Sequence, residues 1–365
     1  MLKRLLIGGV ALSLLAGAGL YWWQSSPAGI PQSAVEGAAP TPARPDHYTI
    51  TWAGDTMFGW AGQRLIKKKG PKYVVDKLRP FLAADYTIIN LEAPISTLTR
   101  EDMPEKHRVW TYNVLPGSLE GFQHVGIDAF ALANNHAFDR GTQGVLDTLR
   151  YANDGGFVVF GVGMNREEAE SPLFVETPFG RVAVVSLSHR GPRLKSAADG
   201  QPGLVYLSRA QMERGYELAK EGKAELVIAF PHWGINYEGV DAAQKRQAKA
   251  FAEIGYDLVI GHGPHVQQPV ARFGETPVLY SLGNFVFGTQ GRFQKNGVTK
   301  DPYGLIAKTF IGPKGVERIE LRCILVDNLK VKYRPRPCSD EERADSFRKL
   351  GPGVIVEDDA AVVVF

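Results

Sequence analysis

From residue 47 onward, short apolar runs of strand character alternate with stretches of helical periodicity. The strand candidates are residues 47–53, 86–91, 129–133, 157–161, 181–187, 226–230, 258–261 and 278–282. The helix candidates between them are residues 73–84, 143–153, 208–221 and 241–254. Several of the strands are apolar throughout, as expected for strands that are buried on both faces. The alternation predicts an α/β fold, in which helices cover a sheet from outside.

Local signals help to place the ends of these elements. Asp241 is of a type that commonly caps a helix, and it begins the last of the predicted helices. After about residue 304 the helical periodicity fades, and residues 303–312 and 315–328 look like paired strands. We expect residues 304–365 to close or cap the fold.

Polar residues gather where five of the predicted strands end. The clusters are Gly54-Asp55, Asn90 with Glu92, Asn134-Asn135-His136, Pro231-His232-Trp233 and Gly261-His262-Gly263-Pro264-His265. In open α/β sheets the carboxyl ends of the strands face one crevice, where ligands bind. We therefore expect the five clusters to converge on one site, because core packing alone does not require polar groups at all five ends.

Together these strand ends supply carboxylates, an amide and imidazoles. The candidate site residues are Asp55, Glu92, Asn135, His136, His232, His262 and His265. A mixed oxygen and nitrogen set suits Mn, Fe or Zn better than Ca or Mg, which prefer oxygen alone. A bridging carboxylate with imidazoles on either side is what a two-metal hydrolytic centre needs. His136 has a second interpretation, because an imidazole titrates near neutral pH and can protonate or hold a leaving group.

Each of these residues alone also has an ordinary structural interpretation. Asp55 and Asn134 are of the types that commonly form turns after strands, and a single histidine is more often a hydrogen-bonded core residue than a ligand. We interpret Asp139 and Gly141 as structural residues at the entry to the helix predicted at 143–153. The number of polar groups at strand ends, rather than any one of them, favours a clustered site.

The charge of the chain excludes one broad class of function. Its formal net charge at pH 7 is +3, and residues 1–45 hold +2 of this through Lys3, Arg4 and Arg44 against Glu36. The remaining +1 gives no excess suited to binding nucleic acid through phosphate contacts. A focused site for an anion stays open, because bound metal cations would add positive charge that a residue count does not include.

The first forty-five residues predict a membrane-targeting segment followed by a linker. Lys3 and Arg4 precede an uncharged stretch at 5–23, whose 19 residues would span about 28 Å as a helix, close to the thickness of a bilayer core. We favour an uncleaved single-pass anchor, because the hydrophobicity continues past Ala18; the alternative is a signal peptide cleaved after Ala18 and a secreted protein. In both cases the body lies outside the cytoplasm. Residues 24–45, rich in proline and alanine, predict a linker.

The chain has two cysteines, Cys323 and Cys338. In an exported protein they can form one disulfide. The alternative is two unpaired thiols, because sequence spacing alone does not show that they are close. Catalysis by a thiol is not favoured with both cysteines near the C-terminus.

Six motifs in a fixed order resemble a known protein family. They are GDTMFG (54–59), NLEAPIS (90–96), LANNHAFDRG (132–141), PHWG (231–234), GHGPHVQQP (261–269) and YSLGNFVFG (280–288). These motifs resemble those of CapA-type capsule-synthesis proteins, a family associated with poly-γ-glutamate synthesis and export. That family is similar to a divergent branch of the calcineurin-like metallophosphoesterases. The resemblance implies a four-layer αββα sandwich over residues 46–303, with residues 304–365 as a β-rich extension of the same body.

The resemblance also implies a role for each site residue. By position, the metal ligands are Asp55, Glu92 as the bridging carboxylate, Asn135, His232, His262 and His265, and the residue that acts on the phosphate is His136. Two positions depart from the superfamily pattern, because Met57 stands where a ligand histidine is expected and Glu92 where an aspartate is expected. We therefore expect one or two divalent ions, with one site weakened, and His189 is a conceivable substitute ligand. Asn134 and Asn284 are expected to orient the histidines.

Three residues beside these motifs are candidates for substrate contact. Arg140 and Arg190 are suited to bidentate contacts with an anionic substrate, and a solvated surface position is the alternative for both. Trp233, like Trp60, is suited to lining a cleft, and a core position is the alternative for both.

Two classes of function remain open. The first is a metal-dependent hydrolase, phosphoesterase-like or processing a γ-glutamyl polymer, that acts outside the cytoplasm on an anionic polymer or its precursor. The second is a non-catalytic, membrane-tethered assembly or export factor that holds polymer in the same cleft, beside a polymer synthase complex in the membrane. Both belong to the biosynthesis of a capsule or a poly-γ-glutamate-type polymer. Metal-dependent turnover distinguishes the two.

Overall fold

A computed structural model describes residues 46–103, 111–189, 195–290, 293–295 and 298–365. The predicted membrane segment at 5–23, the linker at 24–45 and Arg190 lie outside these residues. Among the helices that are described, none is long and apolar enough to cross a membrane.

In the described part of the chain, the larger sheet has ten strands, and β1 (Tyr48–Met57) lies inside it. Its main order is β19 (Val354–Glu357), β20 (Ala360–Val363), β17 (Gly315–Leu325), β16 (Tyr303–Gly312), β1, β2 (Tyr86–Leu91), β3 (Ala129–Ala131) and β4 (Val158–Phe160). Off this path, β13 (Asn284–Phe287) pairs with β1 and β18 (Arg336–Pro337) pairs with β17. The strands β1 to β4 are parallel, whereas β16 is antiparallel to β1. The parallel strands therefore end together at one edge of the sheet.

The smaller sheet is parallel in its middle and antiparallel at its edges. Its order is β11 (Val270–Phe273), β12 (Thr276–Leu279), β10 (Leu258–Ile260), β9 (Leu226–Ala229), β7 (Gly180–Val185) and β6 (Leu173–Thr177). Two short ribbons stand apart, formed by β5 (Val162–Gly163) with β8 (Gly203–Leu204) and by β14 (Gln294–Lys295) with β15 (Val298–Thr299).

The helices are short, and the longest flank the sheets. They are α1 (Trp60–Lys69), α2 (Pro71–Val75), α3 (Arg79–Leu82), α4 (Leu119–His124), α5 (Gly141–Asp154), α6 (Arg166–Glu170), α7 (Arg209–Glu221), α8 (Ala242–Ile254), α9 (Asn328–Val331) and α10 (Asp340–Arg348). Within the described ranges, the 3-10 turns η1 (Asp76–Leu78) and η3 (Pro116–Ser118) accompany them.

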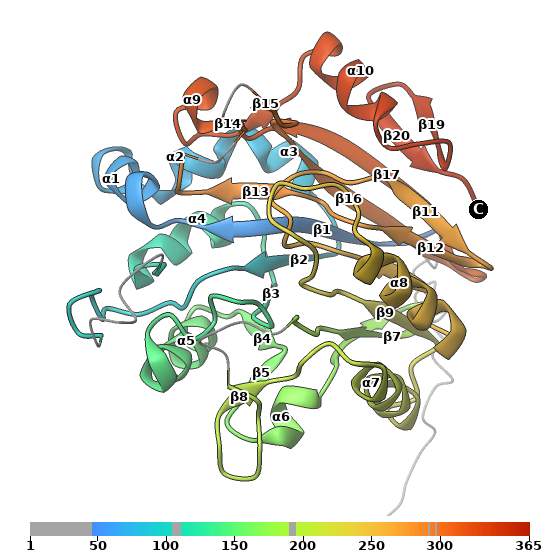
Figure 1. Ribbon diagram of the computed structural model, residues 1–365, viewed down its shortest axis with the longest axis horizontal. Helices are drawn as coiled ribbons and strands as arrows, with labels where there is room; N and C mark the ends of the chain where they lie inside the picture. Colours follow the sequence, from blue (N-terminus) through green and yellow to red (C-terminus); the bar gives the residue numbers. More distant parts are fainter. Residues whose placement is uncertain (1–45, 104–110, 190–194, 291–292, 296–297) are drawn as a thin grey trace, which may run out of the picture. The chain divides into compact units, whose positions relative to one another are not determined.

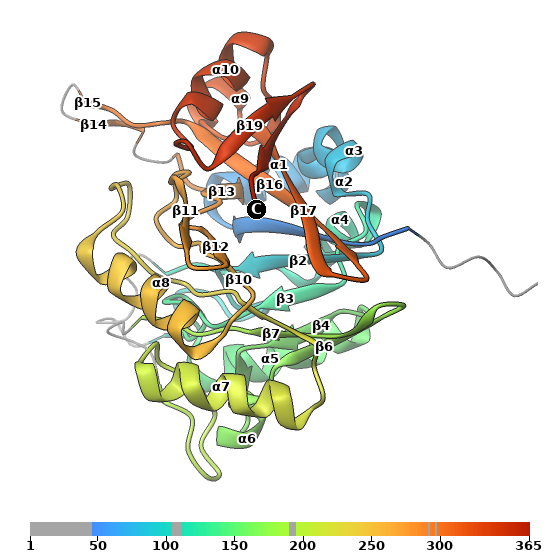
Figure 2. The same ribbon diagram turned by 90° about the vertical axis from the view of Figure 1, so that its right-hand side faces the viewer.

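Three apolar cores arrange the sheets and helices in four layers, which can be followed in Figure 1 and, turned by 90°, in Figure 2. Between the two sheets, Trp52 of β1 packs against Phe230 after β9, with ring centroids 5.5 Å apart. On the other face of the larger sheet, Ile89 belongs to a core that α1, α2, α4 and α5 complete. On the outer face of the smaller sheet, Val227 packs with Phe251 of α8. The layers are therefore helices, sheet, sheet and helices.

The α/β prediction is confirmed in its mixed sheets, and most predicted helices are observed. The helices predicted at 143–153, 208–221 and 241–254 are α5, α7 and α8. Asp241 caps α8 as predicted, and it forms a capping box with Gln244. The prediction of one continuous helix at 73–84 is wrong, because α2, η1 and α3 divide this stretch. Pro80 in the first turn of α3 has no N–H for a longer helix to use.

Residues 303–312 of the C-terminal part form an inner strand of the larger sheet. Strand β16 pairs with β1 from Tyr48 to Ala53, so the part expected to close or cap the fold supplies an inner strand of the larger sheet. Helix α10 begins with a capping box between Ser339 and Glu342, a signal that the sequence analysis did not use. Cys323 and Cys338 form a disulfide, which decides between the two alternatives for the thiols.

Candidate metal centre

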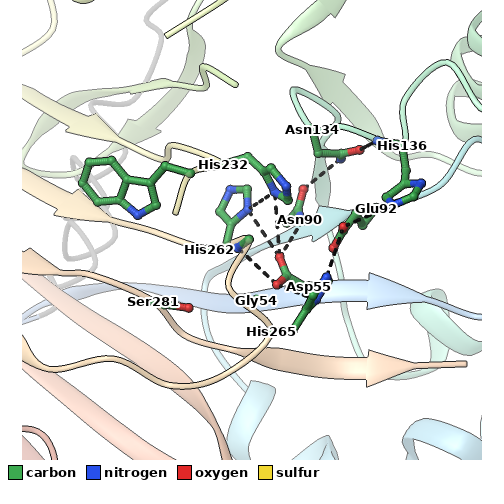
Figure 3. A network of polar contacts seen from close by, with 12 residues as sticks. Gly54, Asp55, Asn90, Glu92, Asn134, His136, His232, His262, His265 and Ser281 are labelled. Atoms are coloured by element: carbon green, nitrogen blue, oxygen red, sulfur yellow. Dashed lines mark hydrogen bonds and ion pairs between the residues drawn. The ribbon is translucent and has the colours of Figure 1, made fainter. Parts of the chain in front are cut away.

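The polar residues at the strand ends meet in one buried cluster (Figure 3). Parallel pairing places Asp55 of β1 beside Asn90 of β2, and the same residue lies beside Asn284 of β13. The segments after β9 and β10 bring His232 and His262 together as backbone partners. Strand β1 continues two residues past Asp55, so this residue lies inside the strand rather than directly after it. The convergence expected from the strand order is therefore observed.

Gly54 gives β1 a close approach to β13. A Cβ at this position would collide with the carbonyl oxygen of Gly283. That same oxygen accepts a hydrogen bond from the backbone N–H of Asp55 at 2.9 Å. The glycine before Asp55 thus has a steric reason, since a larger residue would push the strand and its carboxylate away from the cluster.

Asp55 is fully buried, and both of its carboxylate oxygens have contacts. Oδ1 accepts a hydrogen bond from Nδ2 of Asn90 at 2.9 Å and lies 3.5 Å from Nδ1 of His262. Oδ2 accepts a hydrogen bond from the N–H of Gly263 at 3.1 Å and lies 3.2 Å from Nδ1 of His265. Burial raises the pKa of Asp55, but hydrogen bonding with His262 and His265 outweighs burial and leaves this pKa well below its ordinary value. The side chain is therefore a carboxylate at neutral pH.

Glu92 differs from Asp55 both in its contacts and in the direction of its pKa shift. Its carboxyl group is fully buried, and neither oxygen has a hydrogen-bond partner among the described residues. Oε1 lies 3.7 Å from Nε2 of His265 and 3.9 Å from Nε2 of His136. Burial, with the negative charges of Asp55 and Asp139, raises the pKa of Glu92 well above its ordinary value. A buried carboxylate without partners is costly unless it holds a proton or a cation.

His232 and His262 face each other across the cluster. Their Nδ1 atoms lie 3.1 Å apart, and Nε2 of His262 has no hydrogen-bond partner in the described part of the chain. Burial lowers the pKa of His232 well below its ordinary value, and the neighbouring His262 adds to this effect. His232 is therefore neutral at neutral pH, which is the form of histidine that binds metal ions.

His189 supports His232 from behind. Its Nδ1–H donates to the carbonyl oxygen of His232 at 3.0 Å, and the two rings are stacked with centroids 5.3 Å apart. The conceivable role of His189 as a substitute ligand finds no support in this position, because it belongs to neither group of close donor atoms described below.

His265 is fixed by its backbone and its neighbours. Its φ angle of 62° lies in the left-handed region, which is costly for a residue other than glycine and persists where the surroundings enforce it. Nδ1 lies 3.0 Å from Oδ1 of Asn284, so Asn284 contacts a histidine as expected. The rings of Tyr237 and Phe287 flank the imidazole, with centroids 5.5 and 4.8 Å away.

His136 is held by residues that the sequence analysis did not assign to the site. Its Nδ1–H donates to Oδ2 of Asp139 at 2.6 Å, and the same oxygen accepts from the N–H of Tyr112 at 2.6 Å. The ring of Tyr112 lies against the imidazole, with centroids 4.1 Å apart. Asp139, interpreted from the sequence as a residue at the helix entry, therefore positions His136. Its spacing three residues after the histidine was the available signal.

Asn134 and Asn90 connect the two halves of the cluster. Nδ2 of Asn134 donates to Oδ1 of Asn90 at 2.9 Å, and Oδ1 of Asn134 accepts from the N–H of His136 at 3.1 Å. Asn90 in turn donates to Asp55, so a continuous chain of hydrogen bonds runs from Asp55 to His136. The neighbouring Asn135 has an Oδ1 that is buried without a partner among the described residues.

Two groups of buried side chains bring donor atoms close enough to hold a metal ion. They are Asp55, His232 and His262, and Asp55, Glu92 and His265, with donor atoms within 4.8 Å of one another in each group. Asp55 belongs to both groups, whereas the family resemblance assigned the bridging position to Glu92. Carboxylate and imidazole atoms that have no partner among the described residues fit a divalent cation.

The predicted substrate contacts are not observed. Trp233 is fully buried, packs with Phe251 and donates its Nε1–H to the carbonyl oxygen of Tyr280 at 2.8 Å. Its assignment to the substrate cleft is wrong, because the indole fills the core under α8. Arg140 is buried too, and its guanidinium donates to two backbone carbonyls, so it supports the chain rather than facing an anion. Arg190 lies outside the described residues.

A cavity of about 550 Å³ opens beside the cluster. His265 forms part of its wall, and so does Tyr112, whose ring lies against His136. Trp60, the second tryptophan suited to a cleft, lines this cavity and is 46% exposed. A molecule in the cavity would therefore lie next to His265 and to the Tyr112 ring that packs on His136.

Comparison with known proteins places these features in a family context. The model of the family described as bacterial capsule synthesis protein PGA_cap matches residues 49–289. The chain is 28% identical over 259 residues to the capsule biosynthesis protein CapA of Bacillus anthracis, which covers 69% of this chain and 63% of that protein. It is also 28% identical over 247 residues to the PGA biosynthesis protein CapA of Bacillus subtilis, covering 66% of this chain and 64% of that protein. The chain thus spans just under two thirds of the length of these relatives.

Similar solved structures are more distant. A phosphatase from Mycoplasma pneumoniae is 14% identical, with a TM-score of 0.46 over 77% of this chain and 94% of the other. A 5'-nucleotidase from Candida albicans is 13% identical, with a TM-score of 0.43 over 80% of this chain and 54% of the other. At this distance neither structure bears on the function of the chain.

Proposed function

Because the chain belongs to the bacterial capsule synthesis protein family PGA_cap, we propose that it acts in the biosynthesis of a capsule or a poly-γ-glutamate-type polymer through a metal-dependent, hydrolase-like site. The observation that carries the proposal is a set of buried donor atoms without partners among the described residues. Both oxygens of Glu92 and Nε2 of His262 belong to it. Such atoms are rare in folded proteins and are explained when an ion completes their contacts.

The residues divide between two ions. Asp55 with His232 and His262 would hold one, and Asp55 with Glu92 and His265 the other. The mixed donor set favours Mn, Zn or Fe. Ions held by these residues would supply Lewis-acid chemistry, which activates water at neutral pH and offsets negative charge that develops on a phosphoryl or acyl group.

His136 is arranged for proton transfer beside these ligands. Asp139 accepts a hydrogen bond from Nδ1–H of His136, which leaves Nε2 on the side of Glu92, at 3.9 Å from Oε1. With its proton on Nδ1, the imidazole can accept a proton at Nε2 as a general base, and the carboxylate of Asp139 supports the imidazolium that would then protonate a leaving group from Nε2. The cavity beside His265 would orient the substrate.

The four layers, with the cluster at the ends of parallel strands, support a fold of the metallophosphoesterase type. The apolar stretch at 5–23 after Lys3 and Arg4 supports a single-pass anchor, with the body outside the cytoplasm. In that position the protein would meet an anionic polymer or its precursor beside a membrane synthase or export complex.

The proposal is tested by metal analysis of the purified full-length protein together with an activity screen. The substrates are bis(p-nitrophenyl) phosphate and a γ-glutamyl anilide, each assayed with and without a chelator. We expect bound Mn, Zn or Fe and chelator-sensitive turnover of one substrate. His262→Ala should abolish turnover and lower the metal content, while His124→Ala, at a partly exposed histidine on α4 that contacts Asp76, should change neither.

Two results would contradict parts of the proposal. If no metal is bound and a chelator changes neither turnover nor thermal stability, the metal site is excluded. If metal is bound but His262→Ala leaves polymer production in cells intact, the protein acts as a non-catalytic assembly or export factor instead.

A further inference from the structure

Helix α1 and the start of α2 carry a row of positive charges beside the cavity. Residues 56–75 contain five lysine or arginine side chains and no aspartate or glutamate, although residues 46–365 have a net charge of +1. All five are exposed, and we call them the basic ridge: Arg64, Lys67, Lys68, Lys69 and Lys72. The positive charge is therefore concentrated locally, and the near-neutral total of the body hides it.

The geometry of α1 places the ridge on its outer side. Ile66 faces the core, whereas Arg64 lies three and four positions before Lys67 and Lys68, so these cations share the exposed face. The dipole of a helix favours cations in the last turn, where the lysines of α1 lie. This effect does not explain Arg64 in the middle of α1. It disfavours Lys72, which lies in the first turn of α2.

Most of the ridge is not neutralised by acidic side chains. Lys72 lies 2.9 Å from Glu120, in a pair that is exposed on both sides and therefore contributes little. Arg64 and the three lysines of α1 make no ion pair with the described residues. Like charges at this spacing on a helix repel one another, and a bound anion would remove that repulsion.

The ridge adjoins the cavity beside the metal centre. Arg64 lines this cavity together with His265, a candidate metal ligand. The segment after α9 connects the same parts, because Tyr333 lines the cavity and Arg334 donates from Nε to the carbonyl oxygen of Tyr73 in α2 at 2.9 Å. Helices α1, α2 and α9 thus lie together at the end of the molecule toward which β1 points (Figure 1).

Metal ions at the cluster would extend the positive charge inward. With ions held beside His265, positive charge would continue from the cluster past Arg64 and along the lysines of α1. A ligand with a single charge would use one part of this path, whereas a chain with a negative charge on every unit would use all of it. The cavity volume of about 550 Å³ is typical of sites for small ligands, so a longer chain must continue outside it.

We propose that the basic ridge binds one part of a linear polyanion that has a carboxylate on each unit, while another part of the same chain occupies the cavity. Lysine ammonium groups would contact the carboxylates as point charges, so the ridge would hold the chain without requiring one exact register. This inference rests on the proposed function, because it gives the anionic polymer named there a second place of contact outside the metal centre.

An anionic membrane surface is a different occupant, and the position of the ridge favours the polymer. The predicted anchor joins the body before Tyr48, at the start of β1, whereas α1 follows the other end of this strand. The ten residues of β1 separate the two ends by about 30 Å, at roughly 3.3 Å per residue. The ridge therefore lies close to the cavity and far from the point where the anchor attaches.

The test measures binding of end-labelled long poly-γ-glutamate and of tri-γ-glutamate to the full-length protein by fluorescence anisotropy. The triple variant Lys67→Gln, Lys68→Gln, Lys69→Gln should bind the long chain at least about tenfold more weakly, because three charge contacts are lost. Its affinity should also fall less steeply with salt than that of the wild type. Affinity for tri-γ-glutamate should change little, since so short a chain fills only the cavity. Arg64→Gln should weaken both ligands, because Arg64 lines the cavity and begins the ridge.

The matched control removes three exposed cations from another helix. Lys245, Arg246 and Lys249 are exposed on α8 and do not line the cavity. Their combined replacement by glutamine changes the net charge by the same amount and should leave binding of the long chain unchanged. Metal content and Tm, measured for both triple variants, should match the wild type and so exclude a folding defect.

The outcomes separate this inference from the proposed function. If the variant on α1 binds the long chain as tightly as the wild type, or if both triple variants lose affinity equally, the ridge assignment is overturned while the metal centre stands. If the α1 variant instead loses co-flotation with phosphatidylglycerol vesicles relative to phosphatidylcholine vesicles and keeps its affinity for the polymer, the ridge is a membrane contact and the proposal is wrong. If the protein binds no metal, the proposed hydrolytic site fails, and loss of long-chain binding in the α1 variant alone would still support the ridge.

Discussion

The imidazole of His136 donates a hydrogen bond from Nδ1 to the carboxylate of Asp139 at 2.6 Å. This contact fixes both the tautomer and the orientation of the ring, because the proton on Nδ1 leaves Nε2 as the free nitrogen. Since Asp139 is also held by the N–H of Tyr112, the pair is a rigid unit beside Glu92. Because Asp139 fixes the ring, the role of His136 can be tested by substituting Asp139.

Asp139→Asn should lower kcat on the activated phosphodiester by about 100-fold or more, the usual contribution of a positioned acid or base. An asparagine that presents its amide nitrogen to Nδ1 favours the other tautomer and removes the negative charge that supports a protonated ring. Steady-state kinetics on the substituted enzyme measures the effect, and metal content should stay unchanged. Asp147→Asn is the matched control, because Asp147 is a buried carboxyl group that contacts Ser96 instead of a histidine. An equal loss in both variants would point to a general packing defect.

The position of the cluster was predictable from the sequence, because parallel strands must end at one edge. Asp55, Asn90 and Glu92 follow from that rule once β1 and β2 are recognised as parallel neighbours. The histidines follow from the same rule, because His136, His232 and His262 with His265 also stand after predicted strands. Predicting the position of the cluster did not require knowing where each side chain points.

The direction of individual side chains was not predictable in the same way. Trp233 lies between a site histidine and a glycine, yet its indole points into the core, since the space under α8 is apolar and the carbonyl of Tyr280 can accept its N–H. Arg140 is long enough to face either solvent or the chain, and the nearby backbone carbonyls decide that it faces the chain. Strand β16 pairs with β1 across more than 240 residues of sequence, and no local pattern encodes so distant a partner.

Asp55 is expected to matter for both groups of metal ligands, because its two oxygens face different histidines. Asp55→Asn should weaken metal binding at both groups by at least about 10- to 100-fold, since the neutral amide lacks the charge that holds a cation. His262→Ala should affect the first group and spare the second. Metal content per chain, measured by mass spectrometry after dialysis, distinguishes the two patterns. Equal metal loss in both variants would show that the protein binds a single ion.

Metal affinity should rise with pH because of Glu92. Burial and nearby negative charges raise the pKa of Glu92, so the metal-free protein keeps a proton there above the ordinary glutamate range. The ion must displace this proton, and affinity therefore falls by about tenfold for each pH unit below the raised pKa. By the same sign, the proton on Glu92 stabilises the metal-free fold at low pH, and this contribution is lost as the pH rises through the raised pKa. Calorimetry with Mn²⁺ across a pH series measures the slope, which should flatten in Glu92→Gln.

The family resemblance implies a ligand histidine where this chain has Met57, but we expect that a histidine introduced there would not become a ligand. The side chain is fully buried among Phe58, Ile66 and Phe287, and its sulfur accepts a hydrogen bond from the N–H of Gly59. Met57→His would bury an imidazole in this apolar core, at a cost of about 1–3 kcal/mol of unfolding free energy. Chemical denaturation measures the loss, with Met57→Leu as the volume-matched control. A higher metal content in Met57→His without loss of stability would show that the side chain can reach the cluster.

The disulfide between Cys323 and Cys338 should stabilise the inner part of the larger sheet. It joins β17 to the end of β18, whose residues already pair at Ile324 and Pro337, and it closes a loop with a sequence separation of 15 residues. For a loop of this length the chain-entropy model gives about 3 kcal/mol. The double variant Cys323→Ala with Cys338→Ala should therefore unfold at a Tm several degrees lower, measured by calorimetry. Reducing agent should lower the Tm of the wild-type protein by a similar amount and leave the double variant unchanged, because no other cysteine is present in the sequence. A wild-type Tm that does not respond to reduction would mean that the two strands hold this region without the covalent link.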